Sequence, residues 1–394
     1  MPIIEKNEIE PFEKAIKKEL KETAKQHGQK ERPAAFEKEK KIFEIEEEEE
    51  KETAQEFREK IIEEERKEAE EIVKDFGKEE AEEMPAEKLE EEEEKIVELL
   101  EKVSVKVNVN VALPEAAASA AKTNADGVGL LRAEHMITAA GKHPAEYLRE
   151  GKQEELTAVV KEGVKKVALL FKGKPVLYRT FDARTDEFRH LEGGDKEPEE
   201  DNPMIGWHGI RRDLDEPELL KAQFFAIKQL LMEGVDNLGI MLPFVQNVDE
   251  VKQAKKIAEE CGLSPRNDVK FGVMVETPAA CWIIDDLIEE GIDFVSFGTN
   301  DLTQLTLGLD RNNGKVQKWF SELHPAILKS VNHVIQACKQ AHVHTGICGQ
   351  AGSNPEMVRH LVHFGIDSVS ANIDAVEKIR KVVLVEEKKM FMEK

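Results

Sequence analysis

The segment VSVKVNVNVALPEAAASAA, residues 103–121, changes its hydrophobic period halfway along. Five valines alternate with other residues from Val103 to Val111, which places all five on one face of an extended strand. Pro114 and Glu115 follow and open an alanine-rich stretch, a common beginning for a helix. This segment therefore predicts a β-strand that leads directly into an α-helix.

The same strand-then-helix pattern recurs along the rest of the chain. The further apolar segments are GVGLL (127–131), PVLYRTF (175–181), NLGIMLPF (237–244), KFGVMVE (270–276), FVSFG (294–298), HTGICG (344–349) and SVSANI (368–373). Short apolar strands with helices between them are typical of parallel strands covered on both faces, and eight such units fit a closed barrel better than an open sheet. We therefore predict an α/β fold with a (β/α)8 TIM barrel over about residues 103–385, in a domain of residues 103–394.

Residues 1–102 differ in composition from the barrel and form a predicted region of their own. They contain acidic runs such as EIEEEEEKE (44–52), while sparse apolar residues recur at helical spacing, as in Ile9, Phe12 and Ile16. One interpretation is a solvated charged linker, and the other is a helical, coiled-coil-like arm that makes the protein a homo-oligomer. The sequence favours neither.

Charge, apolar runs and cysteine content argue against several classes of protein. The 394 residues carry a formal net charge of −24, which argues against general electrostatic binding of nucleic acid or anionic membranes, although a local arginine cluster could hold a small anion. The amino terminus lacks the pattern of a signal peptide and no apolar run is long enough to span a membrane, so we expect a cytoplasmic protein. The four cysteines form no C-x-x-C pair, which predicts free thiols.

Polar residues occupy the carboxyl ends of the predicted strands, where chemistry sits in barrels of this kind. One such residue alone is usually part of a structural ion pair. Several charged or polar residues that converge on one mouth of the barrel would cost free energy to bury, unless a ligand or metal interacts with them. The residues are Arg132, Arg179, Glu276, Asn300, Asp301 and Cys348.

The residue types at these ends indicate which ligand they suit. Glu276 and Asp301 supply two hard oxygens for Mg²⁺, with water and substrate completing its shell. Forked donors for phosphate or carboxylate are available from Arg132, Arg179 and Arg311. Residues 298–301 (Gly298, Thr299, Asn300 and Asp301) lead into a predicted helix whose first N–H groups can hold an anion. We therefore expect a small, multiply charged ester of a carboxylic acid.

Two further features bear on this site. Cys348 is interpreted either as a small buried hydrophobe or as a proton donor, with its thiolate favoured beside magnesium and arginines. The segment DARTDEFRHLEGGDKEPEEDNP (182–203) is too long and too rich in Gly, Pro and charge for an ordinary connection, so it predicts a lid over one end of the barrel.

Together these segments resemble the phosphoenolpyruvate (PEP)-utilising enzyme family. The matching text is GVGLLRAEHM, LYRTFDARTDEF with LEGG, NPMIGWHGIRR, GVMVETPAA, FVSFGTNDLTQLTLGLDR and TGICGQAGSNPE, in the family's order and over nearly all of residues 103–385. GICGQ, the DEF–LEGG flap and SVSANIDAV are most similar to the phosphoenolpyruvate synthase branch, archaeal forms in particular. The resemblance implies a TIM barrel that binds pyruvate and PEP with Mg²⁺.

The resemblance also implies roles for particular residues. Arg132 and Arg179 would bind phosphoryl and enolate oxygens, with Arg311 assisting. Glu276 and Asp301 would hold Mg²⁺. The substrate would contact Gly298, Thr299, Asn300 and Asp301. Cys348 would add or remove a proton at the methyl carbon.

This sequence departs from the family pattern in two places. His208 stands in GWHGIRR where the family usually has Arg, which weakens a contact to phosphate unless Arg211 or Arg212 takes its place. The nucleotide-binding domain and the phosphate-carrying histidine domain of the family are not visible, and His27 is the only histidine before residue 103. We therefore expect that the barrel depends on such domains in cis or in trans for turnover.

Three functions remain open from the sequence. The first is the pyruvate/PEP half-site of an enzyme of the pyruvate, water dikinase type, a phosphotransferase. The second is a self-contained Mg²⁺-dependent lyase or aldolase that stabilises a pyruvate enolate, which would not need Cys348 or three arginines. The third is a structural assembly subunit built on an inherited barrel.

Overall fold

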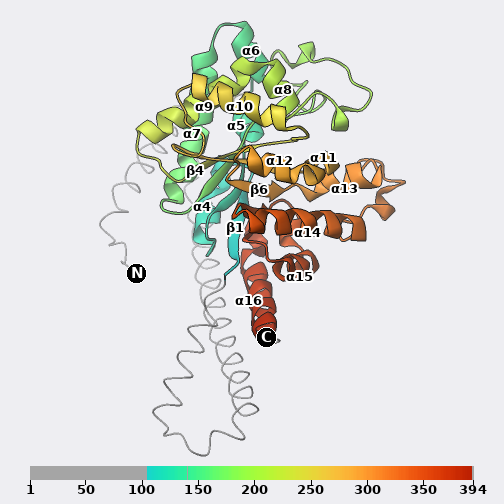
Figure 1. Ribbon diagram of the computed structural model, residues 1–394. Helices are drawn as coiled ribbons and strands as arrows, with labels where there is room; N and C mark the ends of the chain where they lie inside the picture. Colours follow the sequence, from blue (N-terminus) through green and yellow to red (C-terminus); the bar gives the residue numbers. More distant parts are fainter. Residues whose placement is uncertain (1–103, 140, 393–394) are drawn as a thin grey trace, which may run out of the picture. The chain divides into compact units, whose positions relative to one another are not determined.

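The computed structural model describes residues 104–139 and 141–392, and it confirms the predicted barrel (Figure 1). Eight strands pair in sequence order and close through β8 and β1. The strands are β1 (Lys106–Val111), β2 (Val128–Arg132), β3 (Val176–Arg179), β4 (Leu238–Leu242), β5 (Lys270–Val275), β6 (Phe294–Phe297), β7 (His344–Ile347) and β8 (Ser368–Ala371). All eight neighbouring pairs are parallel. The region predicted for residues 1–102 lies outside the described residues.

Helices follow the strands and surround the barrel. They are α4 (Ala117–Lys122), α5 (Ala133–Ala139), α6 (Pro144–Arg149), α7 (Gln153–Leu170), α8 (Ile210–Asp215), α9 (Pro217–Met232), α10 (Val248–Glu260), α11 (Pro278–Trp282), α12 (Ile284–Glu289), α13 (Thr299–Leu307), α14 (Pro325–Gln340), α15 (Pro355–Phe364) and α16 (Val376–Met392). Six of them begin at a proline or behind a capping side chain, as Asn247 does for α10 by accepting from the Asp249 N–H. Among the described helices, none is long and apolar enough to cross a membrane.

Two apolar layers hold the barrel together. The outer layer lies between strands and helices and contains Val105, Val107, Val109 and Val111, which confirms the face expected from their alternation. The inner layer fills the barrel with Leu130, Met241, Met274, Phe294 and Cys348. Gly272 belongs to this packing, because a Cβ there would stand 2.6 Å from the Phe294 ring.

At the amino ends of three strand pairs, an aspartate next to one strand forms a hydrogen bond with the other strand. Asp126, Asp293 and Asp367 each stand at or just before the start of a strand. Their carboxylates accept backbone N–H groups of the preceding strand, from Val107 at 2.8 Å, Phe271 at 2.8 Å and Thr345 at 2.7 Å. Asp126 also pairs with Arg380 at 3.1 Å and Asp293 with Arg266 at 3.3 Å. We call this end of the barrel the lower rim, and its three aspartates are all paired within the chain.

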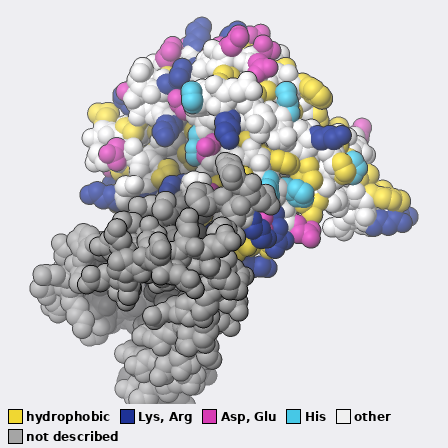
Figure 2. Space-filling view, turned by 60° about the horizontal axis from the view of Figure 1, so that its bottom comes forward, with side chains coloured by type: hydrophobic (Ala, Val, Ile, Leu, Met, Phe, Trp, Pro, Cys, Tyr) yellow, Lys and Arg dark blue, Asp and Glu magenta, His cyan; other side chains and the backbone are white. Residues whose placement is uncertain are grey.

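The segment 182–203 stands between β3 and β4 and contains a single short 3₁₀ turn, η3 (Gly194–Lys196), before η4 (Pro203–Ile205). Internal hydrogen bonds order it. The Thr185 hydroxyl donates to Glu200 Oε2 at 2.7 Å, and the Trp207 N–H donates to Glu200 Oε1 at 2.8 Å. Phe188 packs against Phe181 with ring centroids 6.2 Å apart. On the face shown in Figure 2, Lys and Arg side chains are interspersed with acidic and uncharged ones.

Candidate functional site

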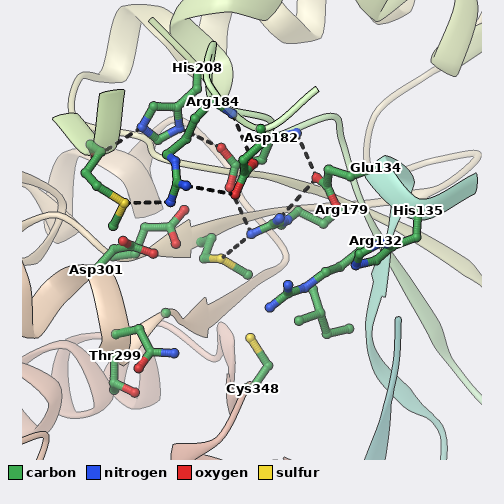
Figure 3. A pocket seen from close by; sticks show the side chains of 18 of the residues that line it. Arg132, Glu134, His135, Arg179, Asp182, Arg184, His208, Thr299, Asp301 and Cys348 are labelled. Atoms are coloured by element: carbon green, nitrogen blue, oxygen red, sulfur yellow. Dashed lines mark hydrogen bonds and ion pairs between the residues drawn. The ribbon is translucent and has the colours of Figure 1, made fainter. Parts of the chain in front are cut away.

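A cavity of about 310 Å³ opens at the carboxyl ends of the strands, which we call the upper rim. Every residue predicted from the sequence to form the site lines it: Arg132, Arg179, Glu276, Gly298, Thr299, Asn300, Asp301, Arg311 and Cys348. They come together because parallel strands deliver all their carboxyl ends to one rim. Figure 3 shows Arg132, Arg179, Thr299, Asp301 and Cys348 around one space.

Arg179, at the end of β3, is held by two carboxylates. Its Nη2 lies 3.0 Å from Glu134 Oε1 and its Nη1 lies 2.9 Å from Asp182 Oδ2. Burial opposes the charged guanidinium, but the charges of Glu134 and Asp182 outweigh it and raise the pKa of Arg179. Arg179 is therefore a fixed cation in the wall of the cavity.

Arg132, at the end of β2, has a different environment. Within residues 104–139 and 141–392, no hydrogen bond or ion pair engages its guanidinium, which points into the cavity in Figure 3. An unpaired guanidinium beside partly buried walls is stabilised by an anion that accepts its forked donors. The arrangement therefore favours an anionic ligand at Arg132.

Glu276 and Asp301 are two acidic groups that line the same cavity as the arginines. Glu276 is 1% exposed, and its Oε1 accepts the Phe244 N–H at 2.6 Å. Burial raises the pKa of Glu276 well above its ordinary value, and the charges of Asp182 and Asp301 raise it further. Burial also raises the pKa of Asp301, although Arg311 lies 3.4 Å away and opposes this shift. A cation between the two carboxylates would relieve both effects.

This donor set fits a hard dication such as Mg²⁺. In the part of the chain that the structure describes, no group of three or more His, Cys, Asp or Glu residues is arranged to hold a metal ion. Two carboxylates alone suit Mg²⁺, which keeps water and substrate oxygens as its other ligands. The residues present therefore fit the metal expected from the sequence.

The turn from β6 into α13 brings backbone close to Glu276. A Cβ at Gly298 would stand 2.5 Å from Glu276 Oε2, so the close approach requires glycine here. The side chain of the next residue, Thr299, is fixed by a hydrogen bond to Glu322 Oε1 at 2.5 Å. Asp301 stands in the first turn of α13. The segment 298–301 is thus placed as the sequence predicted.

Cys348 follows β7, is 4% exposed, and donates from Sγ to the Phe297 carbonyl at 3.6 Å. It belongs to the inner apolar layer and also lines the cavity. Burial raises the pKa of its thiol and outweighs the lowering effects of Ser296, Arg132 and Arg179. Desolvation thus exceeds the attraction of the arginines and favours the thiol in the chain by itself, while the thiolate expected beside bound magnesium stays a prediction. The thiol form suits a proton donor.

The cavity also contains residues that sequence reasoning did not select. Glu134 and Asp182 follow the strand-end arginines in GVGLLRAEHM and LYRTFDARTDEF, and this proximity was the available signal. Further lining residues are Leu130, His135, Arg184, Glu187, Phe188, Met204, Met274 and Gly349, together with His208, which the sequence had marked only as a departure from the family pattern. Several of these belong to the segment predicted as a lid, which lacks a regular period.

Neither arginine proposed to replace a guanidinium at position 208 reaches the cavity. Arg211 donates to the carbonyls of Ile205 and Gly206 at 3.0 Å each. Arg212 is 1% exposed and forms a two-pronged pair with Glu197, with both distances 2.8 Å. Of the two alternatives left open by the sequence, the structure therefore favours a weakened contact over a substitution by Arg211 or Arg212, since both are committed to structural partners.

Comparisons with known proteins agree with the resemblance. Residues 86–388 match the model described as "PEP-utilising enzyme, PEP-binding domain". A phosphoenolpyruvate synthase of Pyrococcus furiosus is 59% identical over 284 residues, covering 72% of this chain and 35% of that protein. A probable phosphoenolpyruvate synthase of Methanocaldococcus jannaschii is 56% identical over 309 residues, covering 77% and 26%. This chain thus spans about a third or less of the length of these relatives.

A solved structure from Burkholderia cenocepacia, an HpcH/HpaI aldolase/citrate lyase family protein, aligns with a TM-score of 0.41 and 15% identity. The alignment covers 74% of this chain and 99% of that one. A structural similarity this weak does not indicate a function.

Proposed function

This chain belongs to the PEP-utilising enzyme family, and from that premise we propose that its barrel binds pyruvate and PEP with Mg²⁺ and interconverts them. The reaction is the phosphoryl/enolate half of a phosphotransferase of the pyruvate, water dikinase type. Nucleotide-binding and phosphohistidine domains, in cis or in trans, supply the phosphoryl group in this proposal.

One observation carries the proposal: an unpaired arginine, an acidic pair and a buried thiol line the same cavity. PEP is a carboxylate and a phosphate ester on one small carbon skeleton, and one of its carbons gains a proton when pyruvate forms. Arg132 and Arg179 suit its anionic oxygens, while Cys348 suits the carbon.

Glu276 and Asp301 would hold the metal, since they are the paired carboxylates of the cavity. Magnesium, when bound, offsets the negative charge that develops on the enolate oxygen. The chain's own residues then position the substrate. Arg132 and Arg179 bind the phosphoryl and enolate oxygens, Arg311 adds a positive charge beside Asp301, and residues 298–301 border the substrate.

Cys348 transfers the proton to and from the substrate carbon in this proposal. When PEP is consumed, its phosphoryl group leaves the enol oxygen for the phosphate-carrying histidine, and the Cys348 thiol gives its proton to the methylene carbon, forming the methyl group of pyruvate. In the opposite direction, the Cys348 thiolate removes a methyl proton, and the enolate oxygen receives the phosphoryl group. The raised pKa of Cys348 matches the form that donates.

The test is loss of the pyruvate methyl proton signal in D₂O, followed by NMR with this chain and Mg²⁺. We expect slow, metal-dependent exchange, abolished in Cys348→Ala, while Cys348→Ala still binds oxalate, an analogue of the pyruvate enolate, in calorimetry. Cys338→Ala is a matched control, because Cys338 is also buried but lies in α14 away from the cavity lining.

Two outcomes would contradict the proposal. Exchange at the wild-type rate in Cys348→Ala would remove Cys348 from the chemistry and favour the lyase alternative. Metal-dependent oxalate binding without exchange in the wild-type chain would indicate a barrel that binds its ligand without acting on it.

A further inference from the structure

His208 lies in the wall of the cavity with both ring nitrogens facing acceptors. The residue is 5% exposed. Its Nδ1 lies 2.7 Å from Asp182 Oδ1, and its Nε2 lies 3.3 Å from the backbone carbonyl oxygen of Met204 (Figure 3). A carboxylate and a carbonyl can only accept hydrogen bonds in these positions. A neutral imidazole has one N–H, so only the imidazolium can donate to both.

The electrostatic surroundings agree with this geometry. Burial acts against the charged ring, but the hydrogen bond and charge of Asp182, together with the Met204 carbonyl, raise the pKa of His208 above its ordinary value of 6.5. The ring also packs on Phe244, with centroids 4.4 Å apart. On the same Phe244 ring, the Arg211 guanidinium carbon lies 4.8 Å from the centroid.

His208 is the end of a row of alternating charges. Asp182 accepts from His208 through Oδ1 and pairs with Arg179 through Oδ2 at 2.9 Å. Arg179 in turn pairs with Glu134 at 3.0 Å. All four side chains line the cavity. The position of Arg179, one of the two proposed anion-binding arginines, therefore depends on a carboxylate that His208 holds.

We propose that His208 is a positioning residue of the anion site: its imidazolium form holds Asp182 and the Met204 backbone in the arrangement that binds anions, and loss of its proton weakens that binding. The inference rests on the proposed function, because it concerns the same cavity and ligand.

Deprotonation has two consequences at the site. A neutral ring that keeps its Nδ1–H on Asp182 turns the Nε2 lone pair toward the Met204 carbonyl, and two acceptors 3.3 Å apart repel each other. Arg184 Nη1 contacts the Met204 sulfur at 2.6 Å. A shift of Met204 therefore also displaces the guanidinium of Arg184, another cation that lines the cavity. In addition, the cavity loses one positive charge while the ligand stays anionic.

Other charged groups surround His208, and they set the direction of the effect. Asp182 and Asp301 favour the imidazolium. Further charges on the elements around His208 include Arg179 on β3, Arg184 and Glu200 in the segment 182–203, Arg211, Arg212 and Asp213 on α8, and Glu276 after β5. Since the pKa of His208 is raised, its charge is present at lower pH and is lost as pH rises through a value above 6.5. Anion affinity should fall over the same interval.

The experiment measures oxalate affinity by calorimetry at saturating Mg²⁺ from about pH 6 to about pH 8.5. Glu276 and Asp301 titrate in every variant, so the wild-type chain is compared with His208→Arg, whose charge is permanent. Relative to that variant, we expect wild-type affinity to fall about tenfold, the change that linkage to one proton gives over a single pH unit. His208→Gln should bind weakly at every pH.

Controls separate His208 from other histidines. His360, on α15 and stacked on Phe364, lies outside the cavity lining, so His360→Gln should keep the wild-type pH profile. His135 lines the cavity, and a profile abolished by His135→Gln but kept by His208→Gln would assign the titration to His135 and overturn the inference. Parallel profiles in the wild type and His208→Arg would overturn it as well. Absence of oxalate binding at every pH would instead refute the proposed function on which it depends.

A ring measurement provides a readout independent of affinity. NMR of ¹⁵N-labelled histidines should show both His208 nitrogens protonated at about pH 7, assigned by loss of the signal in His208→Gln. A His208 ring that is neutral at that pH would contradict the proposal even if affinity changed with pH.

Discussion

The two rims of the barrel use the same charged residue types in opposite ways. At the lower rim, Asp126, Asp293 and Asp367 each accept a backbone N–H of the neighbouring strand. At the upper rim, Glu134 Oε2 and Arg179 Nε are buried with no hydrogen-bond partner among the described residues, and Arg132 has no ion pair there either. Groups that the chain satisfies by itself stabilise the fold. A ligand would satisfy the groups left open at the upper rim, which supports the proposal that it binds there.

The sharpest test of this contrast is Glu276→Gln at the upper rim. The amide can still accept the Phe244 N–H but loses the negative charge, so metal-dependent oxalate binding should weaken by at least about 100-fold in calorimetry. The thermal unfolding midpoint should stay equal or rise, because a buried carboxyl with a raised pKa is removed. Oxalate binding of wild-type strength, or equal binding without metal, would argue against a metal site at Glu276.

A smaller effect is expected from matched arginine substitutions at the two rims. Arg132→Met should weaken oxalate binding by about 10- to 100-fold, the usual loss for a hydrogen bond to a charged group. Arg266→Met removes an arginine of the lower rim that pairs with Asp293, and should leave affinity within about twofold. Equal losses for the two variants would show that net charge, and not the position of Arg132, determines binding.

The smallest effect on binding belongs to Asp293→Ala. This change leaves the Phe271 N–H at the start of β5 without its carboxylate acceptor, so the free energy of unfolding should fall by about 1–3 kcal/mol. The urea unfolding midpoint measures this loss, and Asp293→Asn should recover part of it because its amide oxygen can accept the same N–H. Oxalate affinity should not change. A loss of oxalate affinity without a loss of stability would contradict the claim that the lower rim stabilises the fold and the upper rim binds the ligand.

Much of the fold could be predicted because the information is local. The alternation of Val103–Val111 and seven short apolar segments each mark a strand, and parallel pairing then follows from the helices between them. The same topology explains why residues such as Arg132, Glu276 and Asp301, far apart in sequence, were expected together. Each lies at the end of a strand or within a few residues after it, and a closed barrel gathers strand ends at one rim.

The pairing of charges within the site could not be read from the sequence. Arg132 and Arg179 look alike as strand-end arginines, yet only Arg179 is held by carboxylates. The raised pKa of the Cys348 thiol could not be read from the sequence either, because the balance between desolvation and nearby charge depends on depth in the structure. Position 208 looked like a weakened contact to phosphate, since a histidine stands where the family usually has an arginine. The acceptors at Asp182 and Met204 come from an irregular segment and depend on the tertiary structure.

The lower-rim aspartates also bear on the order in which the barrel can assemble. The hydrogen bonds of Asp126, Asp293 and Asp367 close loops of 19, 22 and 22 residues. The seam between β1 and β8 is different, since Asn110 reaches the Ser370 carbonyl across 260 residues. Closing the longer loop costs about 2 kcal/mol more in chain entropy. Pairing of neighbouring strands therefore costs little chain entropy. The β1–β8 pair can form only after most of the barrel has folded and has brought these two strands together.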